Sequence, residues 1–215
     1  MPVRKIGPNC RSITGRNGNS GQQYESTLER DFLYLLDFDL NVDRYETQPL
    51  TIEYVGNDGR VHPYTPDVFV QYRRDIVPAS SLPHLLVEIK YRDEYRGRFR
   101  ELRQRFRAAR LYAKERGWRF VVLTEREVRT PYLENARFLR PYRDVGFDPA
   151  LEWTVLEQVR TLCETSPTAL VESLADSDWM RGVYLRELWR LVAVGRVGTD
   201  LTLRLSMDSR IWHNG

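Results

Sequence analysis

Residues 64–90 read YTPDVFVQYRRDIVPASSLPHLLVEIK, and this stretch decides the fold. Apolar and β-branched residues crowd the runs VFVQY and HLLVEIK, a composition typical of largely buried strands. Charged residues and then proline and serine separate the two runs, so the chain is expected to turn back between them. The stretch therefore predicts two antiparallel strands that pair with each other.

This pairing predicts a cluster of charged side chains. The start of the first strand lies opposite the end of the second, so Asp67 is expected to face Glu88. Alternation along the strand places Glu88 and Lys90 on one face. Two carboxylates at the edge of a buried sheet need a neutralising charge, and oxygen ligands suit a hard cation such as Mg²⁺. A lysine beside a metal-bound water is an arrangement for hydrolysis. An Asp that caps a turn and a Glu–Lys ion pair on the surface would give the same short P-D…E-x-K motif, so the motif is weak evidence by itself.

A third carboxylate precedes this stretch. Apolar residues at spacings of three and four predict a helix over residues 24–37, and Glu29 lies on or beside its apolar stripe. Burial there penalises a charge unless a cation or donor is near. Ser26 and Glu29 also have the spacing of a capping box. Helix cap and metal ligand therefore stay open as roles for Glu29, with Glu25 as a competing ligand.

The elements around the hairpin follow a recognisable order. Residues 44–54 show the alternation of side chains that is typical of a strand, interrupted by Pro49. Asn57-Asp58-Gly59 then predicts a turn into a second strand that runs to Asp67. The hairpin ending at Lys90 supplies the third strand. An apolar stripe predicts a helix over residues 99–117, and residues 118–123 form a last apolar strand. Helix, three strands, helix, strand is the order of the PD-(D/E)xK nuclease core, which this α/β chain resembles.

The C-terminal part has a different character. Residues 131–142 predict a short helix, and the Gly-Phe-Asp-Pro sequence at 146–149 predicts a boundary. Three helices over 151–162, 167–174 and 180–194 are followed by two strands over 195–207 and 209–212, an order that suggests a winged-helix domain. The predicted organisation is a flexible basic arm over 1–23, a nuclease domain over 24–146 and a winged-helix domain over 147–215. We interpret the last as a protein-docking module.

Composition limits the class of protein. The chain has 215 residues, 41% hydrophobic and 29% charged, as expected of a folded protein without a membrane-spanning run. Cys10 and Cys163 give neither a disulfide framework nor a zinc pattern, and no secretory signal is recognised. A reducing bacterial cytoplasm is therefore the expected location.

Positive charge is concentrated in two segments. Residues 1–23 contain basic residues and no acid, and residues 92–119 contain 11 basic residues against four acids, a net of +7. Such runs are often solvated surface, but arginine is well suited to phosphate contacts. The predicted DNA contacts are Arg11, Arg16, Arg92, Arg96, Arg98, Arg100, Arg103 and Arg107.

From about residue 20 to the end, the chain resembles TnsA, the endonuclease subunit of heteromeric transposases. The resemblance rests on ESTLERDF (25–32), TPDVFV (65–70), VEIK (87–90), WRFVVLTEREV (118–128) and GVYLRELWRLVAVGRV (182–197). Position by position, it implies Glu29, Asp67 and Glu88 as catalytic carboxylates and Lys90 as the catalytic lysine. Some TnsA proteins carry Gln at the position of Glu88, so this chain is closer to the general superfamily pattern.

The resemblance also implies a reaction and partners. A TnsA-like protein cuts the non-transferred strand at the 5′ ends of the transposon, while the DDE transposase TnsB cuts and joins the 3′ ends. An AAA+ ATPase regulator, TnsC, engages the C-terminal domain. Mg²⁺, with Mn²⁺ as a substitute, is expected on Asp67, Glu88 and the Ile89 carbonyl, with Glu29 completing the site or holding a second ion. The alternatives are a non-catalytic DNA-binding assembly adaptor and a stand-alone restriction-like endonuclease.

Overall fold

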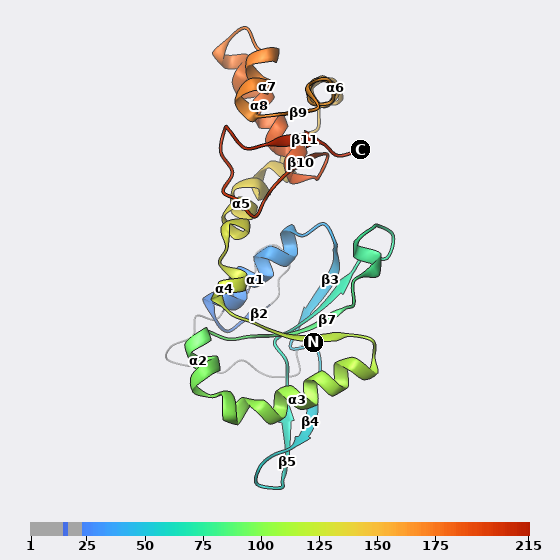
Figure 1. Ribbon diagram of the computed structural model, residues 1–215, viewed down its shortest axis with the longest axis vertical. Coiled ribbons are helices and arrows are strands. Elements are labelled where there is room, and N and C mark those ends of the chain that lie inside the picture. Colours follow the sequence, from blue (N-terminus) through green and yellow to red (C-terminus); the bar gives the residue numbers. More distant parts are fainter. Residues whose placement is uncertain (1–14, 17–22) are drawn as a thin grey trace. The chain divides into compact units, whose positions relative to one another are not determined.

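The computed structural model describes residues 15–16 and 23–215, which divide into two compact units (Figure 1). The first unit ends at Arg129, and the second comprises residues 130–215. Most of the predicted basic arm, Arg11 included, lies outside the described residues. The part that is described pairs Gly15–Arg16 (β1) antiparallel with Gln23–Tyr24 (β2). Across the described residues, no helix is both long enough and apolar enough to cross a membrane.

The first unit is built on a four-stranded sheet in the order β3-β6-β7-β8, formed by Val42–Thr47, Val68–Tyr72, Leu85–Ile89 and Arg119–Leu123. Strands β6 and β7 are antiparallel, which confirms the predicted hairpin, and β8 lies parallel to β7. A short 3-10 helix, Ala79–Ser81 (η1), lies in the connection between β6 and β7. Val68 pairs with Val87, so the residues one position beyond, Asp67 and Glu88, lie opposite each other at the end of the ladder.

Helices cover both faces of this sheet. Helix α1 (Thr27–Phe38) packs Leu28 and Phe32 on one face, in a core that includes Val68 and Val87. Helix α3 (Phe99–Glu115) packs on the other face, in a core that includes Leu86. The short helices Arg92–Gly97 (α2) and Glu125–Val128 (α4) flank α3 and β8 in the sequence. This mixed α/β architecture is consistent with a nuclease-like core.

Strands β4 (Ile52–Val55) and β5 (Val61–Tyr64) form a separate two-stranded hairpin, with Gly59 at φ 72° in its turn. Helix α3 contacts β4 (Figure 1). The sequence predicted one interrupted strand over 44–54 and a partner that runs to Asp67, which differs from this arrangement. Gln48 has φ 50° and precedes Pro49, so the chain leaves the central sheet there and returns only at β6.

The second unit contains five helical segments and a small sheet. The helical segments are Pro131–Leu139 (α5), Arg140–Asp144 (η2), Pro149–Leu162 (α6), Pro167–Leu174 (α7) and Asp178–Ala193 (α8). The sheet has the order β10-β11-β9, formed by Val197–Thr199, Ile211–His213 and Glu164–Thr165. The predicted C-terminal strands pair as β10 and β11, but each has three residues and a long loop joins them. The winged-helix assignment stays a prediction.

The division between the units differs from the predicted boundary at residue 146, because α5 and η2 belong to the second unit. The rings of Phe138 and Trp189 lie 5.3 Å apart, edge to face, and Arg143 Nε donates to the Ala193 carbonyl at 2.8 Å. Helix α8 supplies both partners. The Gly-Phe-Asp-Pro sequence therefore marks a turn inside the second unit.

Arg129 is the last residue of the first unit, and three bonds fix it to that unit. Its Nε donates to Asp31 Oδ2 at 2.9 Å, and its Nη2 donates to the hydroxyls of Thr27 at 3.0 Å and Tyr91 at 3.3 Å. Asp31 is 3% exposed, so the guanidinium neutralises a buried carboxylate. The end of the first unit is thus attached to the start of α1.

Candidate active site

Asp67 and Glu88 reach one end of the β6–β7 ladder from opposite strands. The Ile89 N–H donates to Asp67 Oδ2 at 2.6 Å, which fixes this carboxylate against β7. Glu88 lies within β7 and is 2% exposed. The strand pairing predicted from the sequence therefore brings these two carboxylates to one place.

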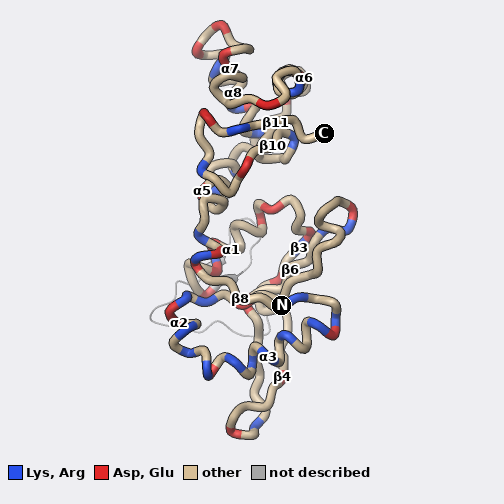
Figure 2. The backbone as a smooth tube through the Cα atoms, in the orientation of Figure 1, with Lys and Arg blue, Asp and Glu red and all other residues tan. Residues whose placement is uncertain are grey.

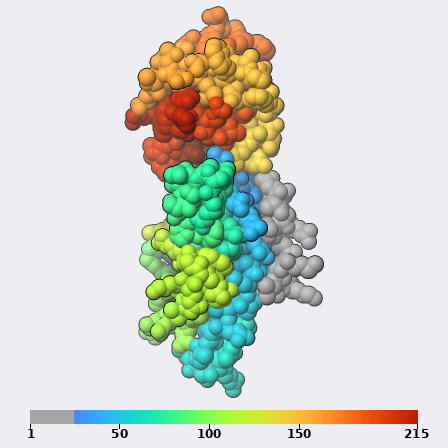
Figure 3. All heavy atoms as spheres, turned by 90° about the vertical axis from the view of Figure 1, so that its right-hand side faces the viewer, coloured from blue at the N-terminus to red at the C-terminus, as the bar shows by residue number. Residues whose placement is uncertain are grey.

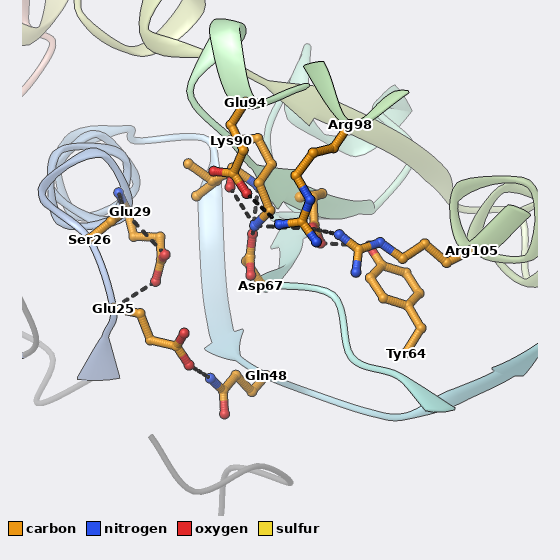
Figure 4. A network of polar contacts seen from close by, with 12 residues as sticks. Glu25, Ser26, Glu29, Gln48, Tyr64, Asp67, Lys90, Glu94, Arg98 and Arg105 are labelled. Atoms are coloured by element: carbon orange, nitrogen blue, oxygen red, sulfur yellow. Dashed lines mark hydrogen bonds and ion pairs between the residues drawn. The ribbon is translucent and has the colours of Figure 1, made fainter. Parts of the chain in front are cut away.

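The Lys90 ammonium lies among oxygen atoms at this end of the β6–β7 ladder. Its Nζ is 3.1 Å from Glu88 Oε1 and 3.6 Å from Asp67 Oδ2, and it donates to the Ile89 carbonyl at 3.0 Å. Figure 4 shows its side chain ending beside Asp67, with Glu29 approaching from α1 and Arg105 from α3. Three oxygens thus converge on one positive charge, and they are the same three that the sequence analysis assigned to a metal ion.

Burial and mutual repulsion shift the ionisation of this group. Burial, followed by the charge of Asp67, raises the pKa of Glu88 to about 7. Burial by itself lowers the pKa of Lys90, but the charges of Asp67 and Glu88 outweigh it and raise that pKa above its ordinary value. Lys90 is therefore protonated at neutral pH, and Glu88 is readily neutralised by a proton or a cation.

Glu29 caps its own helix. Ser26 Oγ donates to Glu29 Oε1 at 3.1 Å and also accepts from the Glu29 N–H at 3.1 Å, while the Glu25 N–H donates to Glu29 Oε2 at 2.8 Å. Burial and then the charge of Asp67 raise the pKa of Glu29 to about 8, and Lys90 acts in the opposite direction. Glu29 is thus both a helix cap and an electrostatic neighbour of the β6–β7 carboxylates. The competing candidate, Glu25, accepts instead from Gln48 Nε2 at 2.8 Å.

A metal centre would need some of these groups to rearrange. Among the residues that the structure describes, no three His, Cys, Asp or Glu side chains are grouped to hold one ion. The donor set nevertheless fits a hard cation, because Asp67, Glu88 and the Ile89 carbonyl already converge on the Lys90 ammonium. Glu29 would have to give up its capping hydrogen bonds before it could act as a metal ligand.

The structure adds two residues that the sequence analysis missed. The Tyr64 hydroxyl donates to Glu88 Oε2 at 2.6 Å, and burial raises the pKa of this tyrosine, so it remains a donor. Arg105 reaches Glu88 Oε1 with Nη2 at 3.8 Å, and its guanidinium lies 5.4 Å from the Tyr64 ring centroid. The Arg105 Nε is buried and has no hydrogen-bond partner among the described residues. The signal for Arg105 was its position next to Phe106 on the apolar side of α3.

Replacing Tyr64 with Phe is expected to weaken Mn²⁺ binding about 10-fold, because the change removes only the hydroxyl that orients Glu88. Calorimetric titration of the full chain would measure this affinity. Tyr54→Phe, on strand β4 of the same hairpin, is the matched control and should leave the affinity unchanged. Equal metal affinity in Tyr64→Phe and wild type would contradict a positioning role for Tyr64.

The arginines that were predicted to contact DNA differ in whether their side chains have partners. Lys and Arg recur along α2 and α3, as Figure 2 shows. Arg98 pairs with Glu94 at 3.2 Å and Glu101 at 2.5 Å, so its charge is partly compensated. Arg16 belongs to β1, and its side chain is not described. Within the described residues, no side-chain partner is found for the remaining members of the set: Arg92, Arg96, Arg100, Arg103 and Arg107.

Comparison with known protein families finds a match over part of the chain. Residues 39–125 match the family described as TnsA-like endonuclease N terminal. The matched segment contains Asp67, Glu88 and Lys90, whereas Glu29 and the second unit lie outside it. No curated protein matches the chain. The convergent carboxylates thus lie in the part of the chain that is similar to the TnsA-like endonuclease family.

Proposed function

We propose that the chain is the metal-dependent DNA endonuclease subunit of a heteromeric transposase. In this proposal it cuts the non-transferred strand at the 5′ ends of the transposon and so permits cut-and-paste transposition. One observation carries the proposal: Asp67, Glu88 and the Ile89 carbonyl converge on a single positive charge at the end of the β6–β7 ladder. The match to an endonuclease family over the same residues supports it.

The same oxygens would hold Mg²⁺, or Mn²⁺ in its place, with Glu29 completing the site or holding a second ion. When bound, such an ion lowers the pKa of a water and neutralises charge on the phosphate. The Ile89 N–H keeps Asp67 in position, and Tyr64 does the same for Glu88. These contacts reduce the reorganisation needed before the reaction.

Lys90 acts as a donor and a charge in this proposal. Its raised pKa makes it a poor acceptor for a proton at neutral pH. Its ammonium is placed to orient an attacking water or to contact the scissile phosphate once the carboxylates have another counter-ion. A lysine beside a metal-bound water could orient the water, deprotonate it or stabilise charge on the phosphate. The raised pKa of Lys90 disfavours deprotonation and leaves the other two roles.

The remaining parts of the proposal concern partners. The substrate would be double-stranded transposon-end DNA, bound by the exposed arginines of α2 and α3. TnsB would act on the 3′ ends in the same complex, and TnsC would engage the second unit, residues 130–215. A non-catalytic assembly adaptor is the second candidate. It is favoured by the capping bonds of Glu29 and by the lack of a grouped three-ligand site among the described residues.

Strand-resolved cleavage of a transposon-end duplex tests this function. The full chain is mixed with the candidate transposase and ATPase in Mg²⁺, and each partner is omitted in turn. The 5′ cut is expected only when this chain is present, and the 3′ cut is expected without it. A 5′ cut that appears without this chain would support the adaptor, and cutting by the chain alone would support a restriction-like enzyme.

A further inference from the structure

A groove of about 580 Å³ lies between α3 and the β4–β5 hairpin. Arg100, Arg103 and Arg107 line it from the helix, and Tyr54 and Val55 line it from β4. Figure 3 shows the surfaces of these two segments next to each other, α3 in yellow-green and the hairpin in cyan. Among the described residues that line the groove, none is acidic.

The positive charge of the groove continues along α3. Residues 100, 103, 107, 110 and 114 are basic, and their spacings of three and four place them on one side of the helix. All five are exposed, and none has a hydrogen-bond or ion-pair partner to its side chain among the described residues. The two acids of α3 pair elsewhere, Glu101 with Arg98 and Glu115 with Arg116. The stripe is therefore an uncompensated row of cations.

This groove is separate from the candidate active site. Arg105 points toward Glu88, and it follows Arg100 by five residues, which corresponds to a rotation of about 140° around a helix. The groove and the carboxylates therefore lie on different flanks of α3. The part of a ligand that lies in the groove would therefore be separate from the part that contacts Asp67 or Glu88.

We propose that this groove binds the sugar-phosphate backbone of duplex DNA at a position outside the phosphate that is cut. The proposal rests on the proposed function and extends it with a second contact to the substrate. A run from residue 100 to residue 114 spans about 21 Å of helix, and DNA presents a phosphate per strand every 3.4 Å along its axis. The stripe is thus long enough to meet phosphates over about six base pairs.

The neutral lining of the groove suits the same ligand. Gln104 of α3 donates to Asn57 of the hairpin turn, so two amides lie between the arginines and the hairpin. Amides can bond both to phosphate and to sugar oxygens. Val55, which is 60% exposed, and Leu111, 55% exposed, offer apolar surface for deoxyribose carbons. A groove that offers both charged and apolar side chains matches a nucleic-acid backbone.

Equilibrium binding of the full chain to a 40-base-pair duplex without divalent metal tests the groove. The Arg103→Gln, Arg107→Gln double variant is expected to bind about 10-fold or more weakly, and the salt slope of the affinity should fall by about two. The control is Arg44→Gln with Arg73→Gln, which removes the same charge from side chains bonded to Gln71 and Asp75. The control variant should keep the wild-type affinity and slope.

A second variant separates groove chemistry from total charge. Gln104→Glu keeps the side-chain size and places one carboxylate in the groove, so it should weaken duplex binding, whereas Gln71→Glu on β6 should not. Equal losses in the groove and control variants would overturn the proposal. So would a larger loss on a 40-nucleotide single strand than on the duplex. Because no metal or cleavage is involved, a failure here is distinct from a failure of the nuclease assignment.

Discussion

Replacing Asp67 with Asn is expected to reduce cleavage of the 5′ strand about 10³-fold or more, while the partner transposase still cuts and joins the 3′ ends. The change removes one negative charge from the three-oxygen group but keeps an acceptor for the Ile89 N–H. A neutral amide is a poor ligand for a hard cation, and a thousandfold loss corresponds to about 4 kcal/mol of transition-state stabilisation.

Strand-resolved gels of transposon-end DNA, with the transposase and ATPase present, would measure both cuts at once. Asp75→Asn is the matched control, because this exposed carboxylate pairs only with Arg73 in the contacts recorded for the described residues. The control should cleave as wild type does. Normal double-strand excision by Asp67→Asn would remove Asp67 from the catalytic group and leave the adaptor as the better function.

Replacing Lys90 with Met is expected to have two large effects of opposite kind. Cleavage of the 5′ strand should be lost, because no donor remains to orient the water or contact the phosphate. Mn²⁺ should bind more tightly than to wild type, because the Lys90 ammonium no longer competes for Asp67 Oδ2 and Glu88 Oε1. Titration calorimetry reads the second effect independently of any cleavage. Unchanged metal affinity would show that the lysine does not compete with the ion.

The Lys90→Met variant should also be less stable in a pH-dependent way. Removing one partner from a buried group of ions lowers the free energy of unfolding by about 3 kcal/mol when the remaining partners are charged. Burial raises the folded-state pKa of Glu88 to about 7, so folding is disfavoured increasingly as pH rises from about 4.5 to that value. Without Lys90 this pKa rises further. The stability deficit should therefore be small at pH 5 and largest near pH 8.

Urea unfolding of the metal-free full chain at several pH values would measure this deficit. Lys114→Met is the control, because Lys114 is exposed and has no side-chain partner among the described residues. It should unfold as wild type does across the pH range. A Lys90→Met deficit that is the same at pH 5 and pH 8 would contradict the coupling between Lys90 and Glu88.

Local patterns in the sequence predicted the parts of the site that one hairpin determines. Strand alternation and the return of the chain placed Asp67 opposite Glu88, and the register bears this out. Glu29 shows the limit of such reasoning. A capping box and a metal ligand need the same residue at the same spacing, and the structure shows the capping bonds.

Features that depend on distant packing could not be predicted. Alternation over residues 44–64 indicated strands but not which sheet they join, and the turn at Gln48 separates β4 and β5 from the central sheet. Arg105 was counted among the charges of a basic segment, although its place next to Phe106 directs it inward. The amphipathic helix α5 does not reveal in its own sequence which core it joins.

The bonds of Arg129 determine where the chain can be shortened. A fragment trimmed to the family match, residues 39–125, would lack α1 and the guanidinium that neutralises buried Asp31. It would expose the apolar face of the sheet that Leu28 and Phe32 cover. The smallest autonomous fragment of the first unit should therefore begin before α1 and end no earlier than Arg129, whatever the limits of sequence similarity.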